Sequence, residues 1–223
     1  MPCSNLDSSR IPRLLATLLC AAAISTVGAQ EADLPVGLCE SCHGPNGASV
    51  TPGIPSLAGQ NEPYLFESLK ELRGERSSSP TMLGILAGRS DGELQRLARH
   101  FASRPYFRRT QEVDPARSGR GREAYLKLCQ LCHHDEGRST TYGEYPLLAG
   151  QDLGYLLRVM GLILDGKRRV YAIKRDLIAL ASREQIEDAI HFFASQKVTP
   201  DQVTTALNSS NEKRSRRSKI KTP

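Results

Sequence analysis

Two Cys-x-x-Cys-His pentapeptides, Cys39–His43 and Cys129–His133, open two matching halves of the 223-residue chain. Three further blocks recur behind each pentapeptide in the same order: PSLAGQ at 55–60 and PLLAGQ at 146–151, GER at 74–76 and GKR at 166–168, and FAS at 101–103 and 193–195. The offset between the halves grows from 90 to 92 residues, which small insertions explain. The sequence therefore predicts one structural unit that occurs twice.

The middle of each unit follows the spacing of an amphipathic helix. A helix is expected after Asn61 in the first half and after Asp152 in the second, because both residue types are good helix caps. Each of these helices carries an apolar stripe of helical period and ends at a glycine. The stripes and their glycines are Leu65, Leu69, Leu72 and Gly74, and then Leu156, Val159, Ile163 and Gly166.

A second helix in each half is expected to begin at a capping box, in which Ser90 pairs with Glu93 and Ser182 with Gln185. An apolar stripe of the kind found in protein cores follows each box: Leu94, Leu97, Ala98 and Phe101, and then Ile186, Ala189, Ile190 and Phe193. No alternating strand pattern competes with these helices, so the predicted fold class is all-α.

The ends of the chain differ from the two repeated units. Residues 1–29 have the layout of a secretory signal peptide, with Arg10 and Arg13 before an apolar run and small residues for cleavage near Ala29. An uncleaved N-terminal anchor is the alternative, although the apolar run is short for a bilayer span. We therefore expect a periplasmic protein with a first domain at 30–104, a linker at 105–118, a second domain at 119–200 and a basic, disordered tail at 201–223.

Cysteine usage identifies the chemistry of the pentapeptides. Of six cysteines, Cys3 and Cys20 lie in the predicted signal, and the other four are the two motif pairs. Two thiols at this spacing reach the two vinyl groups of one porphyrin, and the histidine that follows ligates the iron. The thiols are Cys39, Cys42, Cys129 and Cys132, and the histidines are His43 and His133. The sequence thus predicts two covalently bound haem c groups.

Other uses of paired cysteines fit less well. Zinc sites bring their ligand pairs within about 12–20 residues, whereas 86 residues separate Cys42 from Cys129. A thioredoxin-like motif would need a βαβ context, which the pattern does not provide. Structural disulfides would not explain why each motif ends in histidine.

From about Leu38 to Lys197 the chain resembles the dihaem cytochrome c4 family, through its two haem motifs, its two Leu-Ala-Gly-Gln blocks and its two closing helices. The resemblance implies two tandem class I cytochrome c domains, each wrapped around one covalent haem. It implies an electron carrier that serves a respiratory terminal oxidase or a similar acceptor. It also implies that a proline carbonyl, of Pro55 or Pro146, accepts a hydrogen bond from each iron-bound histidine.

Class I cytochromes complete the iron with a methionine, and Met82 has the right position in the first half. It follows Pro80 and stands eight residues before Ser90. A flexible loop between the helices is expected to let its thioether reach the iron. A core methionine is the alternative, but no other methionine lies between the two haem motifs.

The second half departs from this pattern, because Lys174 occupies the position that matches Met82. Ile173 is the alternative if the insertion lies elsewhere. Met160 is expected in the core, His134 on the wrong side of the ring and His191 on the surface. Three outcomes remain open for the second iron: ligation by a neutral Lys174, an open site, or ligation by water or histidine.

Two classes of function follow from these patterns. The first is an electron carrier with a donor and an acceptor protein, and the second is a haem enzyme or subunit, in sulfur-compound oxidation or peroxide chemistry, that uses an open second haem. Of the formal charge of +6, nearly all lies in residues 212–223, which hold six basic residues and one acidic residue. This basic tail is suited to peripheral contact with an anionic membrane surface. Nucleic acid is not an expected partner, because the body of the exported chain is neutral.

Overall fold

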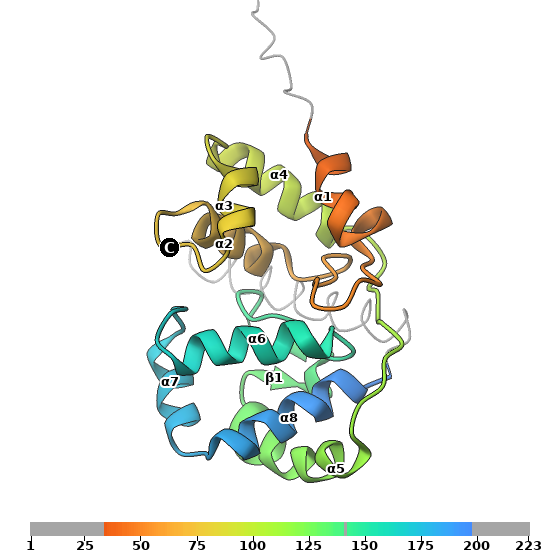
Figure 1. The fold of residues 1–223 in the computed structure, drawn as a ribbon, viewed down its shortest axis with the longest axis vertical. Helices are drawn as coiled ribbons and strands as arrows, with labels where there is room; N and C mark the ends of the chain where they lie inside the picture. The colour runs from red at the N-terminus through yellow and green to blue at the C-terminus, as the bar shows by residue number, and fades with distance from the viewer. Residues whose placement is uncertain (1–33, 141, 198–223) are drawn as a thin grey trace, which may run out of the picture. The chain divides into compact units, whose positions relative to one another are not determined.

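The computed structural model describes residues 34–140 and 142–197, and the predicted signal peptide and most of the predicted tail lie outside them. The first half contains α1 (Val36–His43), a 3-10 turn (Pro45–Gly47), α2 (Glu62–Arg73), α3 (Pro80–Leu86) and α4 (Asp91–Ala102) (Figure 1). The second half contains α5 (Pro115–Ala124), a π-helical turn (Tyr125–Cys129), β1 (His133–His134), a 3-10 turn (Asp135–Gly137), β2 (Ser139–Thr140), α6 (Leu153–Leu164), α7 (Ala172–Ala179) and α8 (Arg183–Ser195). The predicted all-α class is confirmed, with one short antiparallel pair of strands as the exception.

Helix caps account for where the principal helices begin. Both predicted capping boxes are present at the starts of α4 and α8. Asp152 also caps α6 as expected, because its carboxylate accepts a hydrogen bond from the Tyr155 amide at 2.7 Å. Asn61 was expected to do the same for α2, and this expectation is wrong. The Asn61 side chain makes no capping bond, and its amide instead donates to the Tyr145 carbonyl of the second half at 2.7 Å.

Each half has its own apolar core. In the first half α4 supplies the most buried side chains, with Leu94, Leu97 and Ala98 at most 1% exposed. In the second half α8 supplies Ile186, Ile190 and Phe193, which pack against Tyr125 and α6. The apolar stripes predicted from the sequence are therefore the core faces of these helices.

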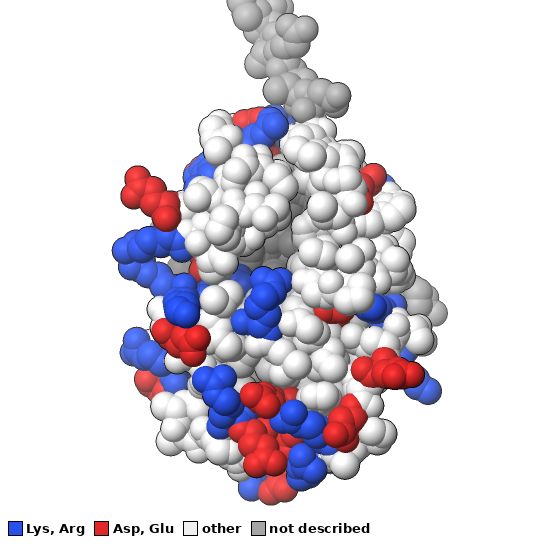
Figure 2. All heavy atoms as spheres, in the orientation of Figure 1, with Lys and Arg blue, Asp and Glu red and all other residues white. Residues whose placement is uncertain are grey.

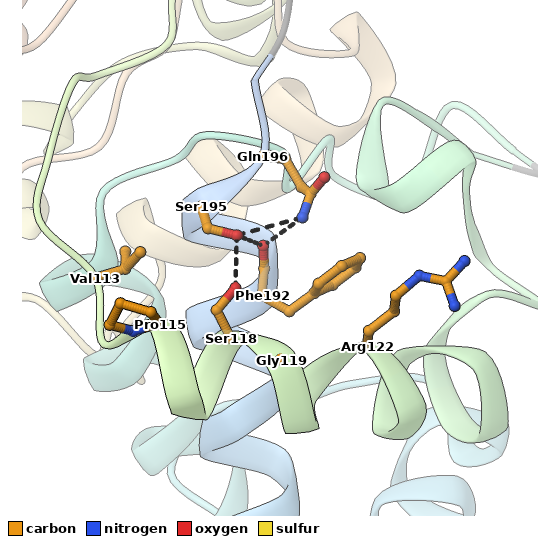
Figure 3. Close-up of a pocket in the computed structure, with 8 residues that line it drawn as sticks. All are labelled: Val113, Pro115, Ser118, Gly119, Arg122, Phe192, Ser195 and Gln196. Atoms are coloured by element: carbon orange, nitrogen blue, oxygen red, sulfur yellow. Dashed lines mark hydrogen bonds between the residues drawn. The ribbon is translucent and has the colours of Figure 1, made fainter.

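Helices α5 and α8 lie side by side in the second half, and polar groups join them (Figure 1). Arg117 and Arg120 of α5 both form ion pairs at 2.7 Å with the buried Asp188 of α8. Figure 3 shows a shallow hollow at the other end of this contact, where the hydroxyls of Ser118 and Ser195 are hydrogen-bonded at 2.8 Å.

The packing of α5 explains the burial of His191. This residue was expected on the surface, and that expectation is wrong, because His191 is only 8% exposed. Its Nδ1 accepts a hydrogen bond from the Asp114 amide just before α5. The periodicity of α8 placed His191 off the apolar stripe, but α5 covers that second face of the helix.

The two repeated glutamines join the halves reciprocally. The side chain of Gln60 pairs with both backbone groups of Leu147, accepting from the amide at 2.7 Å and donating to the carbonyl at 3.0 Å. The side chain of Gln151 pairs in the same way with Ser56, at 2.9 Å for both bonds. Each copy of the Leu-Ala-Gly-Gln block therefore satisfies the backbone of the other copy.

The segment between the halves crosses both of these blocks. Tyr106 lies so close to Gly59 that a Cβ at Gly59 would collide with the Tyr106 backbone. A Cβ at Gly150 would collide with the side chain of Arg108. Both glycines also have positive φ, of 67° and 69°. A hydrogen bond of 2.8 Å from the Tyr106 hydroxyl to the Ala149 carbonyl also holds this segment against the second half. Helix α5 begins at Pro115, inside the stretch assigned to the linker, and the domain boundaries stay a prediction.

Candidate haem-binding sites

Helix α1 carries the whole first pentapeptide and ends at its histidine. Gly44 follows with a φ of 77°, which stops the helix and leaves His43 as its last residue. The His43 ring is 8% exposed, and its Nδ1 lies 2.8 Å from the Pro55 carbonyl oxygen. With Nδ1–H donating to this carbonyl, Nε2 is left without a proton and faces the interior as a ligand.

Burial also sets the charge state of His43. It lowers the pKa of the imidazole below its ordinary value, and the hydrogen bond to Pro55 opposes this effect only in part. The neutral ring is the form that binds a metal ion. Burial similarly raises the pKa of the Cys39 thiol.

The second pentapeptide has a different backbone. Cys129 ends a π-helical turn, and His133 lies in the two-residue strand β1. The histidine nevertheless keeps the same partner as in the first half, since its Nδ1 lies 3.1 Å from the Pro146 carbonyl oxygen. The proline hydrogen bond expected from the family resemblance is therefore present in both halves.

The second histidine is held neutral more strongly than the first. Burial and the nearby positive charge of Lys174 lower the pKa of His133 to about 3. Burial also raises the pKa of the Cys129 thiol to about 11. All four motif cysteines are free thiols, as thioether formation requires.

Met82 and Lys174 occupy equivalent positions on short helices. Each is the third residue of its helix, α3 or α7. Met82 was expected on a flexible loop, and that expectation is wrong, because Ser79 caps α3 and accepts a hydrogen bond from the Met82 amide. Burial lowers the pKa of Lys174, and the Arg168 guanidinium lowers it further.

One cavity of about 910 Å³ joins all of these groups. Its walls include both motif histidines, all four motif cysteines, Met82 and Lys174. The rest of the wall is mainly apolar and comes from both cores, including Leu65, Leu97, Phe101, Leu156, Ile190 and Phe193. Figure 2 shows one face of the molecule with a hollow that lies mainly among uncharged side chains and has Lys and Arg side chains along its lower edge. The cavity suits a large, mostly apolar group in each half.

A polar cluster lies in the cavity wall where the two halves meet. Arg168 is 10% exposed at its side chain and forms an ion pair with Glu71 of the first half at 3.4 Å. The Tyr155 hydroxyl hydrogen-bonds with Arg168 and with Tyr64. Two signals in the sequence pointed to it: the repeated Tyr-Leu dipeptides at 64–65 and 155–156, and the basic cluster of Arg168, Arg169, Lys174 and Arg175, which can pair with haem propionates. A buried guanidinium and two phenols suit carboxylates, and a porphyrin carries two of them as propionates.

The other residues considered as iron ligands are Met160, His134 and Ile173. Met160 is half-buried in α6 and packs against the core, as expected, although it also touches the cavity. His134 is exposed in β1, and Ile173 is 49% exposed on α7 and also touches the cavity. Within residues 34–140 and 142–197, no group of three or more His, Cys, Asp or Glu side chains is placed to hold a metal ion. No helix in these same residues is long and apolar enough to cross a membrane.

Comparison with known proteins places this arrangement in a family, although no family model matches the chain. The chain is 29% identical over 178 residues to cytochrome c4 of Azotobacter vinelandii, which covers 70% of this chain and 84% of the relative. It is 27% identical to cytochrome c4 of Pseudomonas aeruginosa, and this match covers 70% of this chain and 83% of that relative. The crystal structure of reduced recombinant cytochrome c4 from Pseudomonas stutzeri superimposes with a TM-score of 0.63 at 26% identity, covering 73% of this chain and 95% of that one.

A shorter match concerns a different kind of relative. Over 79 residues the chain is 40% identical to the thiosulfate dehydrogenase electron acceptor of Stutzerimonas stutzeri, which covers 34% of this chain and 36% of that protein.

Proposed function

We propose that the chain carries electrons in the periplasm to a respiratory terminal oxidase or a similar acceptor, as a member of the dihaem cytochrome c4 family of c-type cytochromes, which act in electron transfer and bind two haem c groups covalently. The observation that supports this proposal most is that both sets of ligand residues line one continuous cavity. Two haems held by these residues would share one cavity and would supply two redox centres for exchange with a partner. We further propose that the donor is a dehydrogenase of the thiosulfate-oxidising type, because a relative described as the electron acceptor of thiosulfate dehydrogenase matches 79 residues at 40% identity.

Each half contributes the same residues to its haem in this proposal. Cys39 and Cys42 hold the first haem by thioethers, and Cys129 and Cys132 hold the second. The haem irons supply the one-electron redox chemistry. His43 and His133 bind them through Nε2, while the carbonyls of the two prolines fix each ring's orientation and increase its basicity.

The residue that would complete the coordination of each iron differs between the halves. We assign Met82 to the first iron, because α3 holds it in the wall of the cavity that also contains His43. Lys174 is the matching residue of the second site, on α7. A thioether favours ferrous iron, whereas an amine, a water or an empty position favours ferric iron, so we expect the second haem to have the lower potential.

A second candidate function rests on that same replacement. If Lys174 does not ligate, the second iron has an open position, and the protein is then a haem enzyme or an enzyme subunit acting on sulfur compounds or peroxide. The cavity wall beside Lys174 contains Arg168 and Arg169, which would favour an anionic substrate.

Spectra of the reduced protein with and without carbon monoxide separate the two functions. For the carrier we expect a mass increment of two haems, reversible reduction of both, and slow or no carbon monoxide binding. Steady turnover of thiosulfate or peroxide by the purified protein, together with fast binding of carbon monoxide to one haem, would support the enzyme instead. A mass increment of one haem or none would contradict both.

A further inference from the structure

The surface around the second haem motif is unusually apolar. Leu131, Tyr142, Tyr171 and Ile173 are respectively 62%, 49%, 54% and 49% exposed. Single exposed apolar side chains are common on proteins, but a group of them around one site marks an interaction surface.

The same positions in the first half are polar. When the repeat offsets of 90, 91 and 92 residues are applied, Leu131 corresponds to Ser41 and Tyr142 to Thr51. Tyr171 and Ile173 correspond to Ser79 and Thr81 in the same way. Because the two halves otherwise share a scaffold, the folding of the unit does not require apolar side chains at these positions.

Ring contacts connect these side chains to the second motif. Tyr145 lies at the centre, with its ring 6.0 Å from that of Tyr142 and 5.7 Å from that of Tyr171. The Tyr145 ring is also 6.1 Å from the His133 ring. We call Leu131, Tyr142, Tyr145, Tyr171 and Ile173 the tyrosine patch.

The rim of the tyrosine patch is basic. Residues 167–176 hold five basic side chains and one acidic one, whereas the equivalent residues 75–84 of the first half hold one of each. Of the five, Arg168 and Lys174 belong to the cavity wall, and Lys167, Arg169 and Arg175 are exposed. Lys167 and Arg175 are respectively 68% and 72% exposed at their side chains. Their acidic neighbours Asp165 and Asp176 lie 3.7 Å away, and exposed pairs of this kind are weak enough for a partner to replace.

We propose that the tyrosine patch is the docking surface for an acidic redox protein, which exchanges electrons with the second half of this chain. The proposal rests on the proposed function and adds which face the partner uses. An aromatic centre with a basic rim is complementary to an apolar patch ringed by carboxylates. Since the patch adjoins His133, its occupant must be able to exchange electrons there, which a lipid surface cannot do.

The test replaces three patch residues with their first-half counterparts in the holoprotein: Leu131→Ser, Tyr142→Thr and Tyr171→Ser. The matched control is Val50→Ser, which removes an apolar side chain that is 68% exposed in the first half. Stopped-flow mixing with an acidic c-type cytochrome measures the second-order rate constant of electron exchange. We expect the triple variant to be slower by about tenfold or more, because aromatic side chains dominate interface energies. The control should stay within about twofold, and the difference should persist at physiological salt, where charge steering is weak.

Reduction by dithionite and the haem spectra are recorded for every variant. If the unmodified protein is not reduced by dithionite, the proposed function fails. If all variants are reduced alike and the triple variant matches the unmodified protein in its exchange with the acidic cytochrome, the docking surface is wrong. The proposal is also overturned if the three substitutions abolish binding to phosphatidylglycerol vesicles, or a dimer seen by sedimentation, while the exchange rate is unchanged.

Discussion

Replacing Gln60 with leucine tests whether the reciprocal glutamine bonds hold the two halves together. The Gln60 side chain is 3% exposed and takes part in three hydrogen bonds, two with Leu147 and one from the Asn61 amide at 3.0 Å. Leucine has a similar volume and can make none of them. At roughly 1 kcal/mol for each buried group that loses its partner, the free energy of unfolding should fall by about 3 kcal/mol.

Thermal unfolding of the holoprotein, followed by the haem absorbance, measures this loss. For a chain of this length about 3 kcal/mol corresponds to a fall of roughly 6–12 °C in Tm. Gln151→Leu removes the equivalent three bonds, with Ser56 and the Asp152 amide, and should cost a similar amount. The exposed Gln130 provides the control, since Gln130→Leu should change the stability by less than about 0.5 kcal/mol.

The stabilities of Gln60→Leu and Gln151→Leu also show whether the lost hydrogen bonds matter when the volume of the side chain is kept. If Gln60→Leu and Gln151→Leu both remain within about 0.5 kcal/mol of the unmodified protein, water or a small backbone shift must satisfy the abandoned groups. The inference that these side chains hold the halves together would then be wrong.

Three further substitutions test the sites and the core. Met82→Ala should abolish the thioether-to-iron charge-transfer band and leave the spectrum of the second haem unchanged; an unchanged band would place the ligand elsewhere. Lys174→Met should raise the lower of two reduction potentials toward the upper one in a spectroelectrochemical titration, and two equal high potentials in the unmodified protein would contradict the assignment. Asp188→Asn should cost about 2–3 kcal/mol in chemical denaturation at pH 7, because two partly exposed arginines lose a buried partner. Burial alone would raise the pKa of Asp188, but hydrogen bonds from Arg120 and Arg117 hold it below its usual range. The carboxylate therefore stabilises the fold at neutral pH, and the difference between the variant and the unmodified protein should shrink as the pH falls through that lowered pKa.

Local signals in the sequence predicted the local structure well. The capping boxes at Ser90 and Ser182 are both present, and the apolar stripes behind them form the two cores. The spacing from each motif histidine to Pro55 or Pro146 corresponds to an observed hydrogen bond. Features of this kind depend on residues within one or two turns, or on a motif whose geometry is fixed by covalent chemistry.

The expectations that failed concern residues whose surroundings come from distant segments. Asn61 is a good cap by residue type, but the carbonyl of Tyr145 in the other half offers its amide a better partner. His191 lies off the stripe of its own helix, yet α5 covers it. Met82 follows a capping serine and a proline, which start a helix where a loop was expected. The apolar periodicity of a helix identifies one buried face of that helix. It does not show whether a second helix packs against another face.

The hydrogen bonds that Gln60 and Gln151 make between the two halves explain why the halves can differ in function without losing their common scaffold. Gln60 and Gln151 each satisfy backbone groups of the other half, so a change in either glutamine disturbs both units. The side chains at Met82 and Lys174 make no such bond across the junction among the described residues, and they can differ without this penalty. The same holds for Tyr171, which faces solvent where the first half has a serine.

If the second haem has the lower potential, electrons that enter beside the tyrosine patch move downhill to the first haem. The patch is then the entrance, and the acidic partner proposed for it is the donor rather than the acceptor. The direction is measurable, because mixing the oxidised protein with a reduced acidic cytochrome should give a transient in which the second haem is reduced before the first.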